Sequence, residues 1–217
     1  LEFRRVLFRS DRLFDALIDP VLDAGGDVLQ FSGDALLVLF AGEGHAMRAC
    51  TAARQMQRVM AEVGQVETLA GRARLRMSAG LHSGPVDLVL MGEAQRMVLA
   101  VGPTTTGCLL AEKAAGPGEL LVTPATAAAI PTTWCRGERD GLHLLGRVPR
   151  PAAAPHAGTG AGSPTVAVAE ASVPVPLRAP LAAGFTGEHR QVALAFLGLR
   201  DLDALIARDG IAAVADR

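Results

Sequence analysis

The sequence has no tyrosine, few other aromatic residues, three cysteines among its 217 residues, and no long run of apolar side chains. Aromatic residues make up 4% of the chain, so alanine, leucine and valine must fill the core that a hydrophobic content of 50% provides. No apolar run approaches the roughly 20 residues of a membrane-spanning helix, and we expect no membrane partner. The formal net charge is −1, without a basic block, so we also expect no nucleic-acid partner.

The three cysteines do not form a recognisable pattern. Cys50, Cys108 and Cys135 are far apart, odd in number and outside any C-x-x-C motif. This arrangement predicts neither a disulfide framework nor a zinc site. We interpret them as reduced thiols of a protein located in the cytoplasm.

Composition divides the chain into four parts. Residues 1–10 (LEFRRVLFRS) lack the alanine bias of the remainder, and we interpret them as a non-native segment. Residues 11–148 carry the alternating helix and strand patterns of one domain. Residues 149–187 are rich in Pro, Ala and Gly, which is typical of a linker. Residues 188–217 begin a new pattern, which predicts the truncated start of a second domain.

Hydrophobic periodicity predicts the elements. Helices are expected from Asp11 to the Gly25-Gly26 pair, with Pro20 kinking the helix or marking an irregular turn, and over 46–63, 104–115, 124–130 and 201–208. Strands are expected over 28–31, 36–40, 75–81, 86–91, 97–101, 119–122, 142–145 and 191–199, and around Trp134. Arg48, Arg54 and Arg58 fall on the polar faces of the second helix. This order predicts an α+β sandwich in which helices cover one face of a sheet.

The segment GGDVLQFSGDALLVLF contains two apolar strands around Ser32, Gly33 and Asp34. Gly-Asp is favourable for a tight hairpin, so Asp34 is expected to be exposed at its tip. Taken alone, an aspartate there is equally well explained as an ordinary turn residue. His82 and Thr104–Thr106 have structural interpretations of the same kind: His82 in packing or turn formation, and the threonines in capping the helix that follows.

These motifs resemble the class III adenylate/guanylate cyclase catalytic domain over about Leu13 to Ile130. GGDVLQFSGDALLVLF resembles its central hairpin, and LRMSAGLHSGPV resembles the strand and turn after its second long helix. The spacing from Gly102 to PGELLV is similar to that of the family's dimer arm. VALAFLGLRDLDALIARDG resembles the first strand and helix of the second half of tandem, soluble adenylyl cyclase-like enzymes. The resemblance implies a ferredoxin-like, antiparallel-rich sandwich.

The resemblance also implies a function. Such enzymes convert ATP to cyclic AMP and pyrophosphate with two metal ions, Mg²⁺ or Mn²⁺, held by two aspartates. Asp34 matches the hairpin ligand, and Phe31, Ser32 and Gly33 would shape the nucleotide site. The other aspartate belongs to a first strand expected before Asp11, where it is missing. We therefore expect this fragment to be inactive alone and to act as half of a pseudo-heterodimer with the second half of the same chain.

Four further positions depart from the family pattern. Gln30 and Leu99 stand where the purine-selecting residues are expected, and Thr106 and Leu110 stand where a ribose-orienting Asn and a phosphate-binding Arg are expected. A tandem enzyme whose second half supplies these contacts explains the replacements. The alternative is a non-catalytic, cyclase-like module for regulation or dimerisation within a larger signalling protein.

Overall fold

The computed structural model describes residues 2–68, 71–92, 96–150, 172–184, 193 and 201–211. Its helices are α1 (Glu2–Asp23), α2 (His45–Val63), α3 (Pro103–Ala114), α4 (Pro124–Ala127), α6 (Val175–Ala182) and α7 (Leu202–Asp209), with the 3-10 turn η1 at Thr132–Trp134. Its strands are β1 (Asp27–Ser32), β2 (Ala35–Leu39), β3 (Gln65–Thr68), β4 (Gly71–Arg74), β5 (Ala79–Leu81), β6 (Asp87–Met91), β7 (Met97–Val101), β8 (Leu120–Val122), β9 (Cys135–Arg139) and β10 (Leu142–Leu145). Within these ranges no helix has the length and apolarity to cross a membrane.

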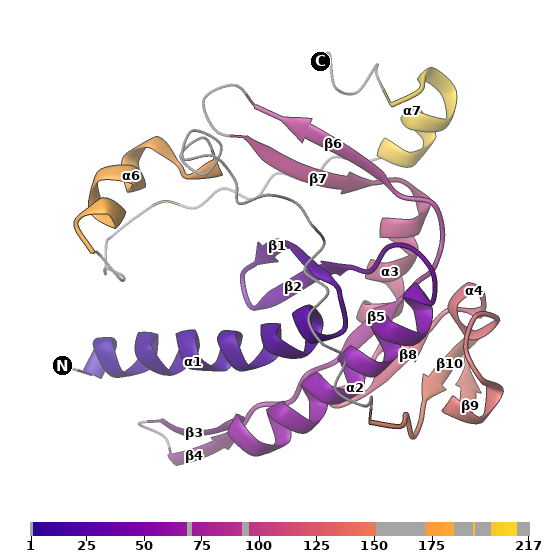
Figure 1. The fold of residues 1–217 in the computed structure, drawn as a ribbon, viewed down its shortest axis with the longest axis horizontal. Helices are drawn as coiled ribbons and strands as arrows, with labels where there is room; N and C mark the ends of the chain where they lie inside the picture. Colours follow the sequence, from indigo (N-terminus) through magenta and orange to yellow (C-terminus); the bar gives the residue numbers. More distant parts are fainter. Residues whose placement is uncertain are drawn as a thin grey trace.

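The strands form four separate sheets in the described part of the chain. Three are antiparallel hairpins, β1–β2, β3–β4 and β6–β7, and the fourth has the order β5-β8-β10-β9. Within it, β5 and β8 run parallel while the other neighbours are antiparallel. Figure 1 shows the β6–β7 ribbon projecting from the helices and the larger sheet. The predicted α+β, antiparallel-rich fold class is confirmed.

Helix α2 supplies the core with its small and flexible apolar side chains. One cluster joins Ala46, Cys50 and Ala53 of α2 to the larger sheet and its C-terminal extension, through Leu120, Val122, Ile130, Leu145 and Val148. A second cluster joins Met56 and Met60 of α2 to Leu17 and Val21 of α1, with side chains of the β1–β2 hairpin packed against it. Alanines let the sheet approach closely and methionines fill the irregular space beyond, so the predicted low-aromatic core is confirmed.

Helices α2 and α3 lie on opposite faces of the larger sheet at β5. Side chains alternate along a strand, and Ala79 and Leu81 pack on the α2 cluster. Gly80 therefore faces the other way, toward α3. A Cβ there would lie 2.1 Å from the backbone nitrogen of Glu112, so the helix rests directly on the strand backbone. The sequence predicted helices on one face of the sheet only. In the structure α3 covers the other face as well, and the close contact at Gly80 allows it to do so.

Two boundaries differ from expectation. α1 begins at Glu2, because residues 2–10 contain no helix-breaking residue, and it continues past Pro20 to Asp23 without an irregular turn. Pro20 lies in the last turn, where the loss of one backbone donor interrupts little. The predicted strand over 75–81 is reduced to β5, and the unpredicted β3–β4 hairpin precedes it.

The C-terminal part is described only in pieces. Helix α6 lies within the segment 149–187 interpreted as a linker, of which residues 151–171 and 185–187 are outside the described residues. The predicted strand over 191–199 is also outside them, apart from residue 193. Helix α7 agrees with the helix predicted over 201–208.

The contact at Gly80 predicts a large loss of stability on adding one methyl group. Gly80→Ala should lower the free energy of unfolding by about 1–3 kcal/mol, because α3 must move off β5 to admit the side chain. The matched control is Gly137→Ala in β9, where a Cβ would meet only a Leu144 methyl at 3.9 Å. Urea unfolding followed by circular dichroism measures both. Equal effects of the two substitutions would contradict the packing described here.

Candidate active site

The β1–β2 hairpin presents the predicted site residues at its tip. Ser32 pairs with Ala35, so Gly33 and Asp34 form a two-residue turn. Gly33 has a φ of 64°, a backbone conformation that favours glycine. Ser32, Gly33 and Asp34 are all exposed. The carboxylate expected at the hairpin tip is therefore available to solvent.

Phe31 anchors this hairpin on α1. Its ring meets that of Phe14 edge to face, with centroids 5.7 Å apart and planes inclined by 71°, a favourable aromatic geometry. Phe31 nevertheless remains 53% exposed. The residue can hold the strand and still present part of its ring beside the hairpin tip.

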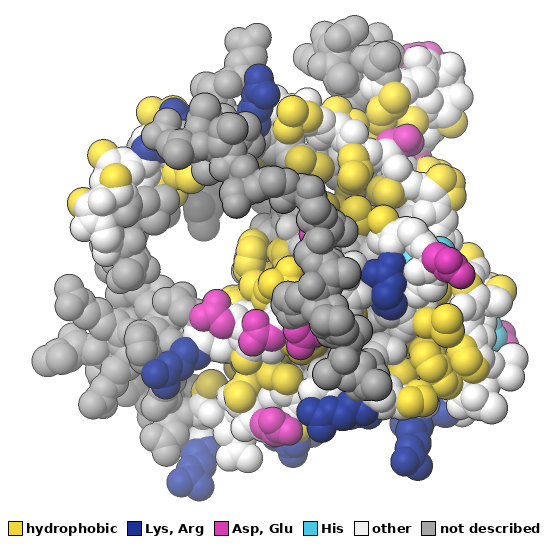
Figure 2. All heavy atoms as spheres, in the orientation of Figure 1, with side chains coloured by type: hydrophobic (Ala, Val, Ile, Leu, Met, Phe, Trp, Pro, Cys, Tyr) yellow, Lys and Arg dark blue, Asp and Glu magenta, His cyan; other side chains and the backbone are white. Residues whose placement is uncertain are grey.

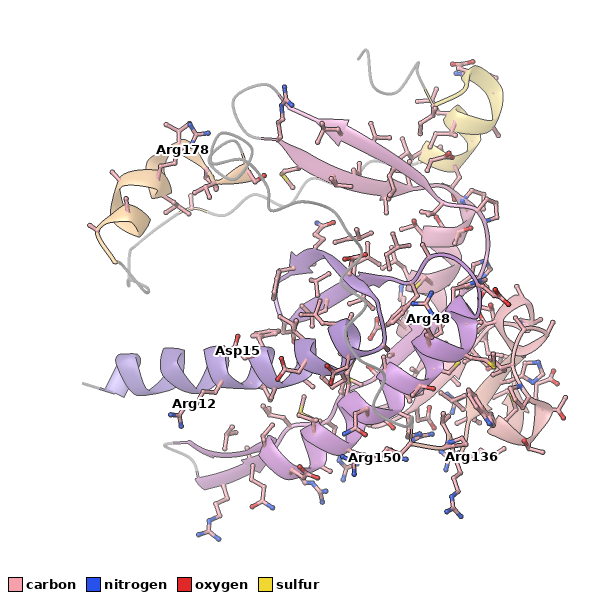
Figure 3. All side chains as sticks on the ribbon, in the orientation of Figure 1. Arg12, Asp15, Arg48, Arg136, Arg150 and Arg178 are labelled. Atoms are coloured by element: carbon pink, nitrogen blue, oxygen red, sulfur yellow. The ribbon has the colours of Figure 1, made fainter. Side chains whose placement is uncertain are left out.

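Arg48 ties both ends of the hairpin to α2. Its Nη1 donates to the carbonyl oxygens of Ala24 at 3.0 Å and Gly25 at 2.7 Å, just before β1. Its Nη2 donates to the carbonyl oxygen of Ala41, just after β2, and to that of Glu43 at 3.5 Å. Figure 3 shows Arg48 beside the N-terminal end of α2. The sequence pattern placed Arg48 on a polar face but gave no sign of this role, because its acceptors are backbone carbonyls.

The described residues do not form a complete metal site by themselves. No group of three or more His, Cys, Asp or Glu side chains in the described ranges is arranged to hold a metal ion. Asp34 offers one exposed carboxylate of the kind that Mg²⁺ or Mn²⁺ prefers. One carboxylate fits one ligand position of a two-metal site, so the arrangement requires a second acidic residue from elsewhere.

The other positions named from the sequence lie on elements that contact one another. β1, which carries Gln30, contacts β7, and β7 contacts α3. Leu99 is on β7 opposite Val89, while Leu110 on α3 is 61% exposed. The fold thus groups these elements beside the hairpin, but the side chains it presents there are mainly apolar.

Thr106 has a partner that sequence reasoning missed. Its hydroxyl donates to Oδ2 of Asp203 at 2.7 Å and so joins α3 to α7. The predicted capping role is not seen at α3, because no side-chain cap is formed at Gly102 and Pro103 occupies the first turn. The partners are 97 residues apart in sequence, which no local pattern can reveal.

The thiols are poor candidates for chemistry. All three cysteines are free, and Cys50 lies fully buried in the core. Burial, with Cys135 as a second cause, raises the pKa of the Cys50 thiol to about 12, and burial also raises the pKa of Cys108. Thiols with raised pKa values are protonated at neutral pH and weakly nucleophilic. The interpretation as reduced, inert cysteines agrees with this environment.

His82 packs as the sequence interpretation expected. Its ring lies against α3 at Gly107, where a Cβ would be 2.9 Å from Nδ1. That Nδ1 is buried and has no hydrogen-bond partner among the described residues. The residue therefore fills space between the β5 end and α3.

Comparison with known proteins identifies the fold. It is the fold of class III adenylyl and guanylyl cyclase catalytic domains, as the sequence resemblance implied. No protein-family model matches the sequence, and no curated protein matches it. The recognition therefore depends on three-dimensional structure and on short motifs.

Three solved structures illustrate the likeness. The guanylyl cyclase Cya2 is 22% identical, with a TM-score of 0.58 over 70% of this chain and 85% of its own. The adenylyl cyclase CyaB from P. aeruginosa is 18% identical, with a TM-score of 0.56 over 69% and 86%. A dimeric guanylyl cyclase domain of the RhoGC fusion protein from the aquatic fungus Blastocladiella emersonii is 20% identical, with a TM-score of 0.53 over 63% and 78%.

Removing the Arg48 guanidinium should loosen the hairpin. Arg48→Met keeps the aliphatic stem and helix propensity but leaves four loop carbonyls without their donor, which should cost about 1.5–3 kcal/mol of unfolding free energy. Urea denaturation measures the loss, and amide hydrogen exchange should increase first in β1 and β2. Arg136→Met is the control, since Arg136 is exposed and forms no hydrogen bond or ion pair in the described ranges. Unchanged exchange in the hairpin would overturn the positioning role.

Proposed function

We propose that this chain is the first half of a nucleotide cyclase that converts ATP to cyclic AMP and pyrophosphate with two Mg²⁺ or Mn²⁺ ions. The observation that carries the proposal is the β1–β2 hairpin of a cyclase fold, which exposes Asp34 at its tip. In this role Asp34 is a metal ligand, and Phe31, Ser32 and Gly33 shape the edge of the nucleotide site. When bound, the ions supply Lewis-acid stabilisation of phosphate charge.

The unpaired edges of the β1–β2 hairpin and of the four-stranded sheet support the view that another strand completes the domain. β2 pairs with β1 alone and β5 pairs with β8 alone among the described residues, so each sheet has an unpaired edge. Both sheets pack on α2. A strand added between them would provide hydrogen-bond partners for both unpaired edges. A carboxylate on that strand would supply a second metal ligand beside Asp34. We expect the chain by itself to be inactive for this reason.

A second cyclase-like half is the proposed partner. Leu88, Leu90 and Met97 of the β6–β7 ribbon are 48%, 60% and 48% exposed, and Leu110 of α3 is 61% exposed. Figure 2 shows hydrophobic side chains gathered over this ribbon. An exposed apolar patch of this kind marks an interface. The second half would also provide the purine, ribose and phosphate contacts that Gln30, Leu99, Thr106 and Leu110 do not provide.

Residues of the second half would select the purine of the substrate. Structural neighbours include both an adenylyl and a guanylyl cyclase, and the residues at the purine-selecting positions here are Gln30 and Leu99. Our preference for ATP derives from the resemblance to tandem, soluble adenylyl cyclase-like enzymes. We propose a cytoplasmic location on the basis of the reduced thiols.

The decisive experiment compares this chain with the full-length protein. With ATP and Mg²⁺ or Mn²⁺, the full-length protein should form cyclic AMP, and this chain alone should form none. Asp34→Asn in the full-length protein should lower kcat at least about 100-fold, because even the loss of groups that only orient a metal ligand costs about 10–100-fold. Asp27→Asn, an exposed aspartate at the other end of β1, is the matched control and should retain activity.

Three results would change the proposal. Cyclic GMP formed from GTP in preference to cyclic AMP would overturn the ATP assignment and keep the cyclase. A full-length protein that pairs its halves but forms neither product would favour the alternative function, a non-catalytic regulatory or dimerisation module. Full activity of Asp34→Asn would remove Asp34 from the site.

A further inference from the structure

A groove runs between the C-terminal half of α2 and the segment that joins β4 to β5. It has a volume of about 350 Å³ and is lined by Met60 and Ala61 of α2, by residues 74–77 and by Pro117–Gly118, with Gln57 between them. We call it the α2 groove. It contains none of the residues assigned above to the nucleotide site. Its walls are exposed at Ala61, residues 74–76 and Pro117–Gly118, so it opens to solvent along its length.

Specific contacts hold the α2 groove open at a fixed width. The Leu75 amide donates to the Gly64 carbonyl at 2.8 Å, which fixes the β4–β5 segment at the end of α2. A Cβ at Gly64 would lie 2.4 Å from the Met60 carbonyl oxygen and 3.2 Å from that of Leu75, so only glycine admits this approach. At the opposite wall, Gln57 donates through Nε2 to the Gly118 carbonyl at 2.7 Å. The groove is therefore bounded by hydrogen bonds on both sides.

The lining combines an apolar floor with positive charge and no carboxylate. Met60 and Met77 form the floor, and Leu75 is 39% exposed beside it. Arg74 and Arg76 are exposed, and neither has an ion pair or side-chain hydrogen bond in the described part of the chain. Two uncompensated cations in one groove contrast with the formal net charge of −1 for the whole chain.

We propose that the α2 groove binds an acidic segment of a partner protein, which inserts an apolar side chain over Met60 and Met77 and places carboxylates against Arg74 and Arg76. Flexible methionines suit such a site because they adapt to the inserted side chain. The complementary charges would steer the partner and fix its direction along the groove. This inference stands apart from the proposed catalytic function, because it uses none of the same residues.

Other anionic partners suit the lining less well. Single-stranded nucleic acids are held by aromatic stacking, and the lining contains no aromatic residue. A membrane surface requires apolar side chains that project outward, whereas the apolar groups here form the floor of a depression between two walls. A protein segment, which carries apolar and acidic side chains together, matches both features.

Fluorescence anisotropy with a synthetic probe tests the proposal. The probe is a labelled peptide with one phenylalanine flanked by glutamates, titrated with the wild-type chain. Binding should saturate, weaken as salt is raised, and fall at least about tenfold in the Arg74→Glu/Arg76→Glu variant, since two attractive pairs become repulsive. Arg136→Glu makes the same kind of charge reversal outside the α2 groove and should bind as wild type does; Figure 3 labels this residue near β9.

A bulky substitution distinguishes binding in the α2 groove from non-specific attraction between charges. Ala61→Trp leaves every charge in place and fills the groove from an exposed helix position, so it should also reduce binding at least about tenfold. Circular dichroism and Tm confirm folding, and Ala61→Trp provides the test should the double variant not fold. Replacing the probe's phenylalanine with serine should weaken binding as well.

The proposal is overturned by any of three results. The first is a probe that does not saturate, and the second is a probe that binds the Arg74→Glu/Arg76→Glu and Ala61→Trp variants as tightly as wild type. The third is an oligonucleotide or an anionic vesicle that binds in an Arg74- and Arg76-dependent way when the peptide does not.

Discussion

Burial of the apolar face of α2 is the interaction on which the remainder of the structure depends. The β1–β2 hairpin and the four-stranded sheet share no strand pairing in the described residues, yet both pack on this helix. Its alanines and Cys50 admit the larger sheet, while Met56 and Met60 reach toward α1 and the hairpin. The relative position of the two sheets is therefore set by side-chain packing rather than by hydrogen bonds, which are the usual link between neighbouring strands.

Hydrogen bonds from the arginines of α2 fix the position of the segments that pack on the helix. Arg48 draws together the loops at the two ends of the hairpin, so the tip bearing Asp34 has a defined position relative to α2. Further along the helix, Arg54 donates to the carbonyl oxygens of Leu145 and Gly146, and Arg58 donates to that of Val148 at 3.1 Å. The arginines on the polar faces of α2 thus bind the chain segments that border it.

The fold separates two surfaces with different chemistry. The β6–β7 ribbon and α3 carry exposed apolar side chains, among them Leu88, Leu90 and Leu110, and form the surface that we propose pairs with a second domain. The α2 groove, with Arg74 and Arg76, lies along the helix that covers the opposite face of β5. The two surfaces share no residue, so the two proposed binding events would not compete for the same side chains.

The sequence by itself determined the fold class, the hairpin with Asp34 at its tip, and most helices, because these depend on local periodicity and on turn residues such as Gly33. Only the tertiary structure decided that α3 rests on Gly80, that Arg48 and Thr106 have their partners, and that a groove opens beside Met60. Those features join residues distant in sequence through backbone carbonyls and van der Waals contact. Such contacts depend on where the whole chain places each backbone atom, and they leave no pattern in neighbouring residues.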